Sequence, residues 1–388
     1  MLSVRPEMVR YFQSLCLSGK PNKLKYFNRN IEDIPKWLSF SAAVGAVLLF
    51  GIVDYITGQD YAFYIFYVIP VLFVVWYVGK VWAYFLVILI TIAWIIDDVY
   101  NRSVLLSDSA LIWNTAVQLS FFFVIIFLFS SLKLSLVRER LAEEEKLKKE
   151  KDVARKVQEK LFPQSTPEMK TIEYYGVCLP ADSVGGDYYD YFRESEQTLF
   201  LAIGDVTGHG LPAALMMASL TGFLRSNAHI HGSSPDKLMN ETNKMMYGST
   251  PSSDFVTLFL SIYNDTTRRL TYVNAGHNPP MLLRNSGTEL ICLDKSGIFA
   301  GAVDDFEYEK HEILLKKGDL LFFYTDGITE AFNSSAEQFG EERLLSVLKN
   351  EINKSPRYIC ESALTSVKKW IDKETQADDI TIIALKVK

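Results

Sequence analysis

Apolar residues are concentrated in one part of this 388-residue chain, and that segregation constrains the fold more than any other feature. Four apolar runs occupy this part, at residues 37–56, 62–78, 81–96 and 111–132. A helix needs about 20 apolar residues, or ~17 at the least, to cross the hydrocarbon of a bilayer. The first and fourth runs meet this length and the second does so marginally. The third run is short unless its helix continues into the adjoining turns. The pattern predicts an α-helical membrane bundle of four transmembrane helices over residues 37–132.

Basic residues are distributed unevenly around these runs. Residues 1–36 carry seven Lys/Arg against three Asp/Glu, the turn at Gly79-Lys80 is basic, and further basic residues follow the fourth run from Lys133 onward. The other two loops contain a single basic residue beside four aspartates. Cytoplasmic loops are enriched in Lys and Arg. We therefore expect a multi-pass protein of the cell (inner, cytoplasmic) membrane with both termini in the cytoplasm, and no cleaved signal peptide.

Three polar residues lie within or beside the apolar runs, namely Asp54, Asn114 and Gln118. They could face a neighbouring helix or the headgroups, or they could form a ligand or proton site inside the bundle. The first interpretation is preferred, because the ends of predicted spans shift easily by a few residues. Both interpretations stay open at this point.

Residues 133–163 read as a charged helical linker. Leu147, Ala154 and Leu161 are spaced seven residues apart, and an earlier apolar set keeps the same spacing in another frame. This pattern is compatible with a solvated connector helix and with a short parallel coiled coil that makes the chain a homodimer. The sequence does not choose between the two. Phe162-Pro163 predicts the end of the helix.

Beyond the linker the pattern becomes strand-rich. Strands are expected at 171–180, 187–192, 199–203, 256–263, 270–274, 280–283, 290–293, 307–315, 320–325 and 380–387. Helices are expected at 212–228, 235–247, 341–350 and 356–372. Many strands with a few amphipathic helices predict an α+β domain in which sheets pack against helices. The predicted domains are therefore 1–36, 37–132, 133–163 and 164–388.

Five aspartates stand in or beside turns at the ends of apolar strands: Asp187, Asp205, Asp326, Asp378 and Asp379. Mg²⁺ and Mn²⁺ prefer carboxylate oxygen, backbone carbonyl and water as ligands. A single Gly-Asp or Asp-Gly pair is ordinary turn chemistry. Four acidic turns in one domain, without a competing His/Cys cluster, predict a metal centre. A carboxylate that bridges two ions ~3.5–4 Å apart would let a shared water attack phosphorus.

Other chemistries are disfavoured by composition and motif. The net charge of −6 argues against nucleic acid as a main partner, because phosphate backbones call for clustered Lys and Arg. The four cysteines form no CxxC pair, so neither a disulfide framework nor a zinc site is expected. The chain contains no Cys-X5-Arg loop and no Walker A lysine, which excludes a phosphocysteine route and P-loop nucleotide hydrolysis.

Five motifs occur in the order of a known family. They are Ser183-Val-Gly-Gly-Asp-Tyr-Tyr-Asp190, Ile203-Gly-Asp-Val-Thr-Gly-His-Gly210, Asn274-Ala-Gly-His-Asn-Pro-Pro280, Phe323-Tyr-Thr-Asp-Gly-Ile-Thr-Glu-Ala331 and Ala377-Asp-Asp-Ile-Thr381. This set resembles the SpoIIE/RsbU-type branch of the PPM (protein phosphatase 2C-like) serine/threonine phosphatases. The resemblance covers about residues 153–388 and leaves the membrane part outside. It implies a β-sandwich of two sheets flanked by helices, with metals in a cleft at one end.

The resemblance also implies roles for individual residues. Asp205 would bridge two Mn²⁺ or Mg²⁺ ions, and the backbone carbonyl of Val206 would bind one of them. Asp187 would hold the second ion, partly through water. Asp326 and Asp378 would complete the shell of the first.

Five further residues are weaker candidates. Asp379 is the less expected ligand of the adjacent acidic pair, since the family's ligand is generally three residues before the threonine. His209 and His277 could act as general acids or ligands, but hard cations prefer oxygen, and holding a loop by hydrogen bonds is the favoured role. Arg193 and Arg225 are candidates for gripping phosphate only because they are near Asp187 in sequence.

Together these features predict a membrane-anchored, metal-dependent protein serine/threonine phosphatase, a hydrolase of signal transduction. By resemblance, its substrate would be a phosphorylated anti-sigma-factor antagonist, and the helix ending at Leu161 would be a regulatory switch element. The alternative is a catalytically silent membrane sensor or scaffold, which the intact acidic positions disfavour. A transporter is disfavoured as well, because four spans with few polar groups make a poor substrate path.

Overall fold

A computed structural model of the chain describes residues 34–57, 63–100, 108–231, 234–249, 255–295, 297–372 and 374–388. Most of the predicted N-terminal segment and parts of the two acidic loops lie outside the described residues. Contacts divide the chain into two compact units, Met1–Glu145 and Lys146–Lys388. We describe each unit by itself.

The first unit is helical. It contains α3 (Lys36–Thr57), the 3-10 helix η2 (Phe63–Tyr67), α4 (Val68–Tyr77), α5 (Lys80–Tyr100) and the first part of α6 (Asp108–Leu161). A small apolar core that includes Val74, Leu86 and Ile126 lies between these helices. Large apolar side chains also cover the outside, among them Leu48 and Phe127, whose exposed fractions are 64% and 66%.

A helix lies at each of the four apolar runs, but the four are unequal in length. Two segments, Lys36–Ile56 and Ser109–Leu161, are long and apolar enough to cross a membrane. The second and third runs give the shorter apolar helices Ile65–Tyr77 and Lys80–Ile96. The second run begins as a 3-10 helix, and it ends where Gly79 adopts a positive φ of 129°. The count of four transmembrane helices therefore stays a prediction.

Two of the polar residues in the apolar runs face a cavity in this unit. Asn114 and Gln118 line a space of about 460 Å³ together with Trp94, Trp113 and several apolar neighbours. Asn114 is itself exposed, so this space is open to the surface of the unit. The cavity keeps the hypothesis of a ligand site open beside the simpler one of packing against a helix.

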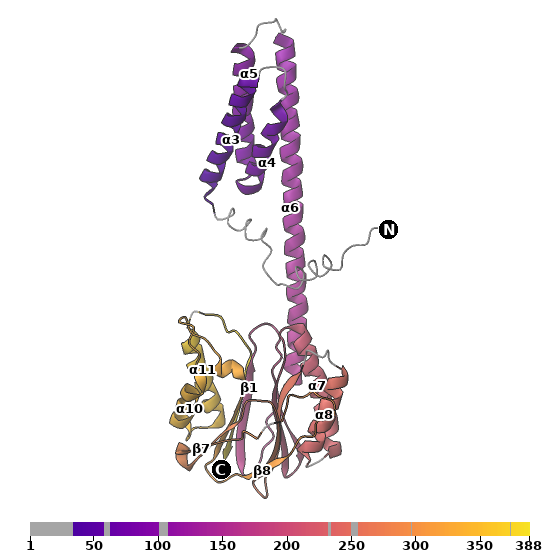
Figure 1. The fold of residues 1–388 in the computed structure, drawn as a ribbon, viewed down its shortest axis with the longest axis vertical. Helices are drawn as coiled ribbons and strands as arrows, with labels where there is room; N and C mark the ends of the chain where they lie inside the picture. The colour runs from indigo at the N-terminus through magenta and orange to yellow at the C-terminus, as the bar shows by residue number, and fades with distance from the viewer. Residues whose placement is uncertain are drawn as a thin grey trace, which may run out of the picture. The chain divides into compact units, whose positions relative to one another are not determined.

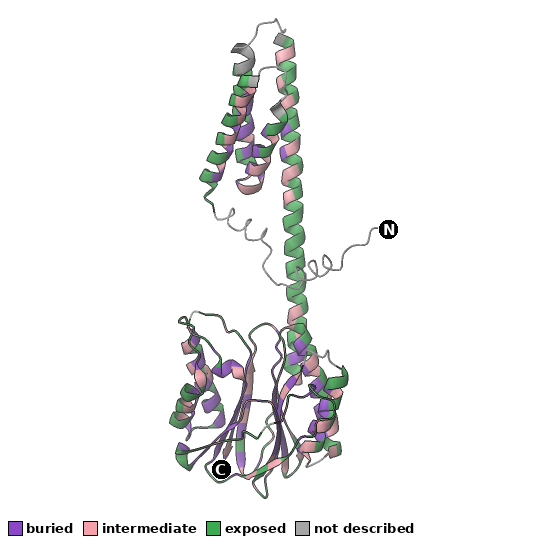
Figure 2. Ribbon diagram, in the orientation of Figure 1, coloured by how far each residue is buried: buried purple, intermediate pink, exposed green. Residues whose placement is uncertain are grey.

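The predicted linker is part of one uninterrupted helix. α6 runs for 54 residues, and the change of heptad frame near Glu143 does not break it. Every residue from 134 to 150 is exposed, as the green stretch of α6 in Figure 2 shows. Such a stretch is compatible with a solvated connector and with a helix that pairs with a second copy, so both interpretations remain.

The second unit is a sandwich of two five-stranded sheets in which every pairing is antiparallel. The strands of the first sheet, in order, are β1 (Ile172–Leu179), β10 (Ile380–Val387), β9 (Leu320–Tyr324), β6 (Met281–Arg284) and β7 (Glu289–Cys292). The strands of the second are β2 (Tyr188–Ser195), β3 (Thr198–Val206), β4 (Val256–Asn264), β5 (Arg269–Ala275) and β8 (His311–Leu314).

Helices cover both outer faces of the sandwich (Figure 1). α10 (Gly340–Glu351) and α11 (Pro356–Ile371) pack on the first sheet, and α7 (Leu211–His231) and α8 (Pro235–Ser249) pack on the second. The chain also contains the short helices η3 (Asn285–Gly287) and α9 (Asp326–Thr329). The α+β sandwich flanked by helices, predicted from the sequence, is therefore present.

Alternate residues of the central strands enter different cores. In β3, Leu201 and Ile203 point between the sheets, whereas Phe200 and Ala202 point toward α7 and α8. Because both faces are covered, these strands read in the sequence as continuous apolar runs. That is why their positions could be predicted closely.

One predicted strand is largely wrong. Residues 307–315 were expected to form a strand, but β8 occupies only His311–Leu314. Tyr308 leaves the sheet edge because its side chain is buried in the core beneath α8, and its backbone N–H donates to the Asn240 side chain at 2.9 Å. Tertiary packing therefore outweighs the strand propensity of this stretch.

Substitution of Phe259 tests the core between the sheets. Phe259 is fully buried and contacts Tyr272 and Phe323, with ring centroids at 5.2 and 5.6 Å. We expect Phe259→Ala to destabilise this unit by about 3–5 kcal/mol and to lower its melting temperature by roughly 10 °C. Thermal unfolding of the full-length protein in detergent measures this. Leu314→Ala, on the exposed side of β8, is the matched control, and an equal effect of both would contradict the assignment of the core.

Candidate active site

The predicted site residues come together at one end of the sandwich. Asp187 precedes β2 and Asp205 lies near the end of β3, and these two ends are neighbours because Tyr188 pairs with Gly204. In the other sheet, Asp326 follows β9 and Asp378 precedes β10, whose ends are likewise paired. Each sheet thus brings one pair of acidic turns to this end.

A hydrogen bond across the sheets fixes one carboxylate. The Thr325 hydroxyl donates to Asp187 Oδ2 at 2.9 Å and accepts from the backbone N–H of Thr381 at 2.9 Å. Thr325 follows β9 and Thr381 lies on β10, whereas Asp187 belongs to the other sheet. The orientation of the Asp187 carboxylate is therefore set by residues of the opposite sheet.

The carboxylates repel one another in a partly dry environment. Burial, followed by the charges of Asp326 and Asp378, raises the pKa of Asp205 to about 7. Burial and then the charge of Asp205 raise the pKa of Asp187 well above its ordinary value. The pKa values of Asp326 and Asp378 are also raised, mainly by burial. Ionising all four groups together thus costs free energy unless a cation compensates their charge.

This donor set fits hard divalent cations. It offers several carboxylate oxygens with an excess of negative charge, and the carbonyl of Val206 follows Asp205 directly. Across the described ranges, however, no three His, Cys, Asp or Glu side chains are spaced closely enough to hold one ion in this geometry. The structure therefore gathers the predicted ligands without arranging them as a finished coordination shell.

Asp379 has a different role from its neighbour. Its carboxylate accepts hydrogen bonds from the backbone N–H groups of Ala181 and Gly186, both at 2.8 Å, and it is 8% exposed. A Cβ at Gly185 would lie 1.8 Å from Asp379 Oδ2, so only glycine fits there. Asp378 is exposed, and its side chain accepts only from the adjacent backbone N–H of Asp379. The contacts thus favour Asp378 as a ligand and Asp379 as the residue that holds the 181–187 loop.

Gln158 is a site residue that the sequence interpretation missed. From α6, its side-chain amide donates to the carbonyl of Gly185 at 2.7 Å and accepts from the N–H of the same residue at 3.1 Å. The side chain is buried, and Gly185 lies two residues before Asp187. A glutamine on an otherwise charged and exposed helix was the only signal in the sequence. The last turns of α6 are therefore bonded to the loop that carries Asp187.

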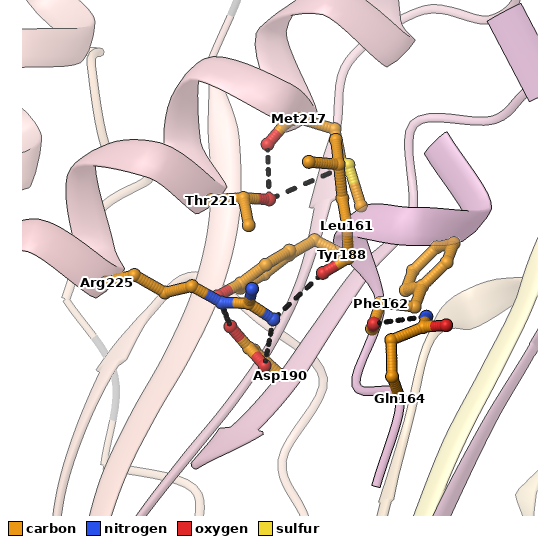
Figure 3. A network of polar contacts seen from close by, with 8 residues as sticks. All are labelled: Leu161, Phe162, Gln164, Tyr188, Asp190, Met217, Thr221 and Arg225. Carbon is orange, nitrogen blue, oxygen red and sulfur yellow. Dashed lines mark hydrogen bonds and ion pairs between the residues drawn. The ribbon is translucent and has the colours of Figure 1, made fainter. Parts of the chain in front are cut away.

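Arg225 anchors the end of α6 rather than a phosphate (Figure 3). Its guanidinium binds both carboxylate oxygens of the buried Asp190, at 2.6 and 3.0 Å, and donates to the backbone carbonyl of Leu161 at 2.9 Å. Arg193 donates to the carbonyls of Ser195 and Glu196 in its own turn. Neither side chain is directed to the acidic turns, so the structure does not support their suggested role in gripping phosphate.

The two histidines of the motifs differ in environment. His277 is buried, and burial lowers its pKa to about 3, so that it is neutral at physiological pH. Its Nδ1 lies 2.9 Å from the Thr257 hydroxyl, and the Asn274 side chain bonds both its N–H and its carbonyl. These contacts fit the predicted role of holding a loop. His209 is exposed.

The second unit has the fold of solved PP2C domains. The SiaA-PP2C domain of Pseudomonas aeruginosa has the same fold, with a TM-score of 0.57 and 24% identity over 63% of this chain and 98% of that one. The phosphatase domain and regulatory fragment of SpoIIE from Bacillus subtilis give a TM-score of 0.50 at 19% identity, over 57% of this chain and 64% of that one.

A family model described as Stage II sporulation protein E (SpoIIE) matches residues 195–388, and the chain belongs to that family. "Phosphoserine phosphatase RsbU" of Bacillus subtilis is 28% identical over 251 residues, which is 63% of this chain and 72% of the relative. "Phosphoserine phosphatase RsbP" of the same organism is 26% identical over 247 residues, or 62% and 58% of the two chains. The predicted enzyme class, a protein serine/threonine phosphatase, is confirmed.

The adjacent pair Asp378 and Asp379 gives a direct test of the two roles. Asp379→Ala removes the acceptor of the Ala181 and Gly186 N–H groups, of which that of Gly186 is buried, and we expect it to cost about 1–3 kcal/mol of stability. Asp378→Ala removes a repelling charge and should leave the stability of the metal-free protein unchanged or raise it. Thermal unfolding in EDTA compares the two variants. A greater loss in Asp378→Ala would reverse the assignment.

Charge repulsion at the site also predicts a pH dependence. Because the pKa of folded Asp205 is about 7 and that of an unfolded aspartate is about 4, the folded state holds an extra proton between these values. The stability that this residue contributes to the metal-free protein therefore falls as pH rises toward 7. The asparagine in Asp205→Asn cannot ionise. The melting temperature of this variant in EDTA, measured relative to that of the natural protein, should therefore rise between pH 5 and pH 7. A constant difference across this range would refute the raised pKa of Asp205, to which burial contributes most and the neighbouring carboxylates next.

Proposed function

We propose that this chain is a membrane-anchored protein phosphatase that uses a water activated by two Mg²⁺ or Mn²⁺ ions. The observation that carries the proposal is the convergence of acidic turns from both sheets, where burial and then the charges of neighbouring carboxylates raise the pKa values of Asp187 and Asp205. A catalytically silent scaffold would have no need of this costly arrangement. The membership of this chain in the SpoIIE family supports the same conclusion.

Five groups would hold the metals. Asp205 would bridge both ions, the carbonyl of Val206 would bind one, and Asp187 would bind the second, partly through water. Asp326 and Asp378 would complete the set of ligands of the first ion. When bound, the ions would supply an acidic water and neutralise the charge of the phosphate.

The remaining residues of the site position these ligands. The Thr325 hydroxyl orients the carboxylate of Asp187, and Asp379 holds the backbone of the loop before it. The neutral side chain of His277 supports the start of β4 through Thr257. These hydrogen bonds fix the ligands before substrate arrives, which lowers the reorganisation needed for reaction.

The proposed substrate is a phosphoserine or phosphothreonine on a small anti-sigma-factor antagonist protein. The names of two relatives, both phosphoserine phosphatases, support the class of substrate. The exposure of Asp378 supports it as well, because a residue on the surface of another protein could reach this carboxylate. The net charge of −6 does not favour nucleic acid.

The helical unit is proposed to anchor the enzyme in the cell membrane, with both termini cytoplasmic. The apolar windows of its two long helices are mostly exposed, 17% and 11% buried, whereas the core helix of a soluble protein would be mostly buried. The exposure of Leu48, Ile52 and Phe127 on the outside of the unit also supports membrane anchoring. Lipid is a favourable environment for such a surface.

Control by the membrane unit would pass through α6. Gln158 and the carbonyl of Leu161 connect the last turns of this helix to both sides of Asp187. The exposed residues Leu134, Val137 and Leu141 offer a surface on which a second copy could pair to form a homodimer. A movement of the paired helices would then displace the loop that carries Asp187.

Hydrolysis of p-nitrophenyl phosphate by the full-length protein in detergent tests the proposal. Turnover should require Mn²⁺ or Mg²⁺ and stop in EDTA. We expect Asp205→Asn to lower kcat by more than about a hundredfold, since changes outside the metal's own ligands already cost ~10–100-fold. Asp305→Asn, in an exposed aspartate that lies outside the acidic turns and the 181–187 loop, is the control. Near-normal activity of Asp205→Asn would refute the two-metal mechanism.

A further inference from the structure

A groove of about 410 Å³ opens beside Asp378. One wall begins at Gly327, next to the predicted ligand Asp326, and continues through the loop that follows α9. The other wall is the segment from Glu374 to Asp378. Each wall therefore starts at or beside a predicted metal ligand, and the groove leads away from the candidate active site.

Hydrogen bonds hold both walls in place. In the first wall, Asn333 Oδ1 accepts from the N–H groups of Ser335 and Glu337, both at 2.9 Å. The Trp370 indole of α11 donates to the Glu337 carbonyl at 3.2 Å. In the second wall, the Gln376 side chain donates to the carbonyls of Leu179 and Asp378, both at 2.8 Å. The groove is thus formed before a ligand binds.

The lining of the groove combines apolar and acidic groups. Phe332 stands on the first wall with 45% of its surface exposed, and the buried Ile371 lies among the lining residues. Glu330 and Glu374 are exposed, one on each wall. The described residues that line the groove include no Lys, Arg or His. A ligand that fits would present an apolar side chain together with a positive charge.

We propose that this groove binds the segment of the phosphoprotein substrate next to the phosphorylated residue. An apolar side chain of that segment packs on Phe332, and a neighbouring Lys or Arg lies between Glu330 and Glu374. This inference rests on the proposed function, because the phosphate must sit at Asp205 and Asp378 for the flanking residues to reach the groove. The acidic rim repels a segment rich in Asp or Glu, so the groove selects among phosphoproteins.

Synthetic phosphoserine peptides that differ only beside the phosphoserine test the inference. One peptide carries a Lys-Leu pair there, a second Glu-Leu and a third Lys-Ala. With the full-length protein in detergent and Mn²⁺ present, the Lys-Leu peptide should have a kcat/KM about tenfold above each of the others. p-Nitrophenyl phosphate, which has no flanking residues, is the reference substrate.

Two variants assign the preference to the groove. Glu374→Lys should remove the preference for Lys over Glu in the peptide. Phe332→Ala should remove the preference for Leu over Ala. Each preference is measured as peptide turnover relative to the turnover of p-nitrophenyl phosphate. Glu168→Lys makes the same charge change at an exposed glutamate that does not line the groove, and it should keep both preferences.

The outcomes separate this inference from the function on which it rests. Equal kcat/KM values for the three peptides, or a Glu374→Lys variant that behaves like Glu168→Lys, would overturn the groove while hydrolysis of p-nitrophenyl phosphate upheld the phosphatase. Loss of metal-dependent turnover of every substrate by the natural protein would refute the phosphatase, and the inference with it.

Discussion

A hydrogen bond from the Thr325 hydroxyl to the Asp187 carboxylate joins the two sheets where their acidic turns meet. Without this contact, nothing in the pairing of strands would fix the distance between turns that belong to different sheets. The antiparallel pairing within each sheet brings Asp187 to Asp205 and Asp326 to Asp378. The threonine then orients one pair toward the other, together with Asp379, whose carboxylate holds the backbone of Gly186 before Asp187.

The rest of the unit supplies the free energy that keeps these carboxylates together. Their raised pKa values mean that the charged state is destabilised by burial and by mutual repulsion. Three apolar layers oppose that cost, one between the sheets and one beneath each pair of helices. The charged carboxylates thus carry a free-energy cost within a well-packed fold, as expected where structure serves metal binding rather than stability.

The sequence predicted the parts of this fold that depend on local pattern. Strands such as β3 and β10 are buried on both faces, so each reads as a short apolar run between turn residues. The sequence also located all the acidic turns, because glycine and aspartate mark most of them. The prediction failed where a contact distant in the chain determines the structure. Tyr308 is such a case, because its backbone bonds to Asn240 of α8 and does not join the edge of the sheet. The buried amide of Gln158 could not be recognised either, since its partner Gly185 lies on another element.

The fit of Gly185 against Asp379 has a consequence for how such a sequence can change. Any side chain at 185 would displace the carboxylate at 379, and any shorter side chain at 379 would leave the loop around 185 without its acceptor. The two positions are remote in the chain, yet the effect of a substitution at one depends on the residue present at the other. The two positions therefore form one epistatic pair. The loop that carries Asp187 tolerates substitutions only as far as both positions allow.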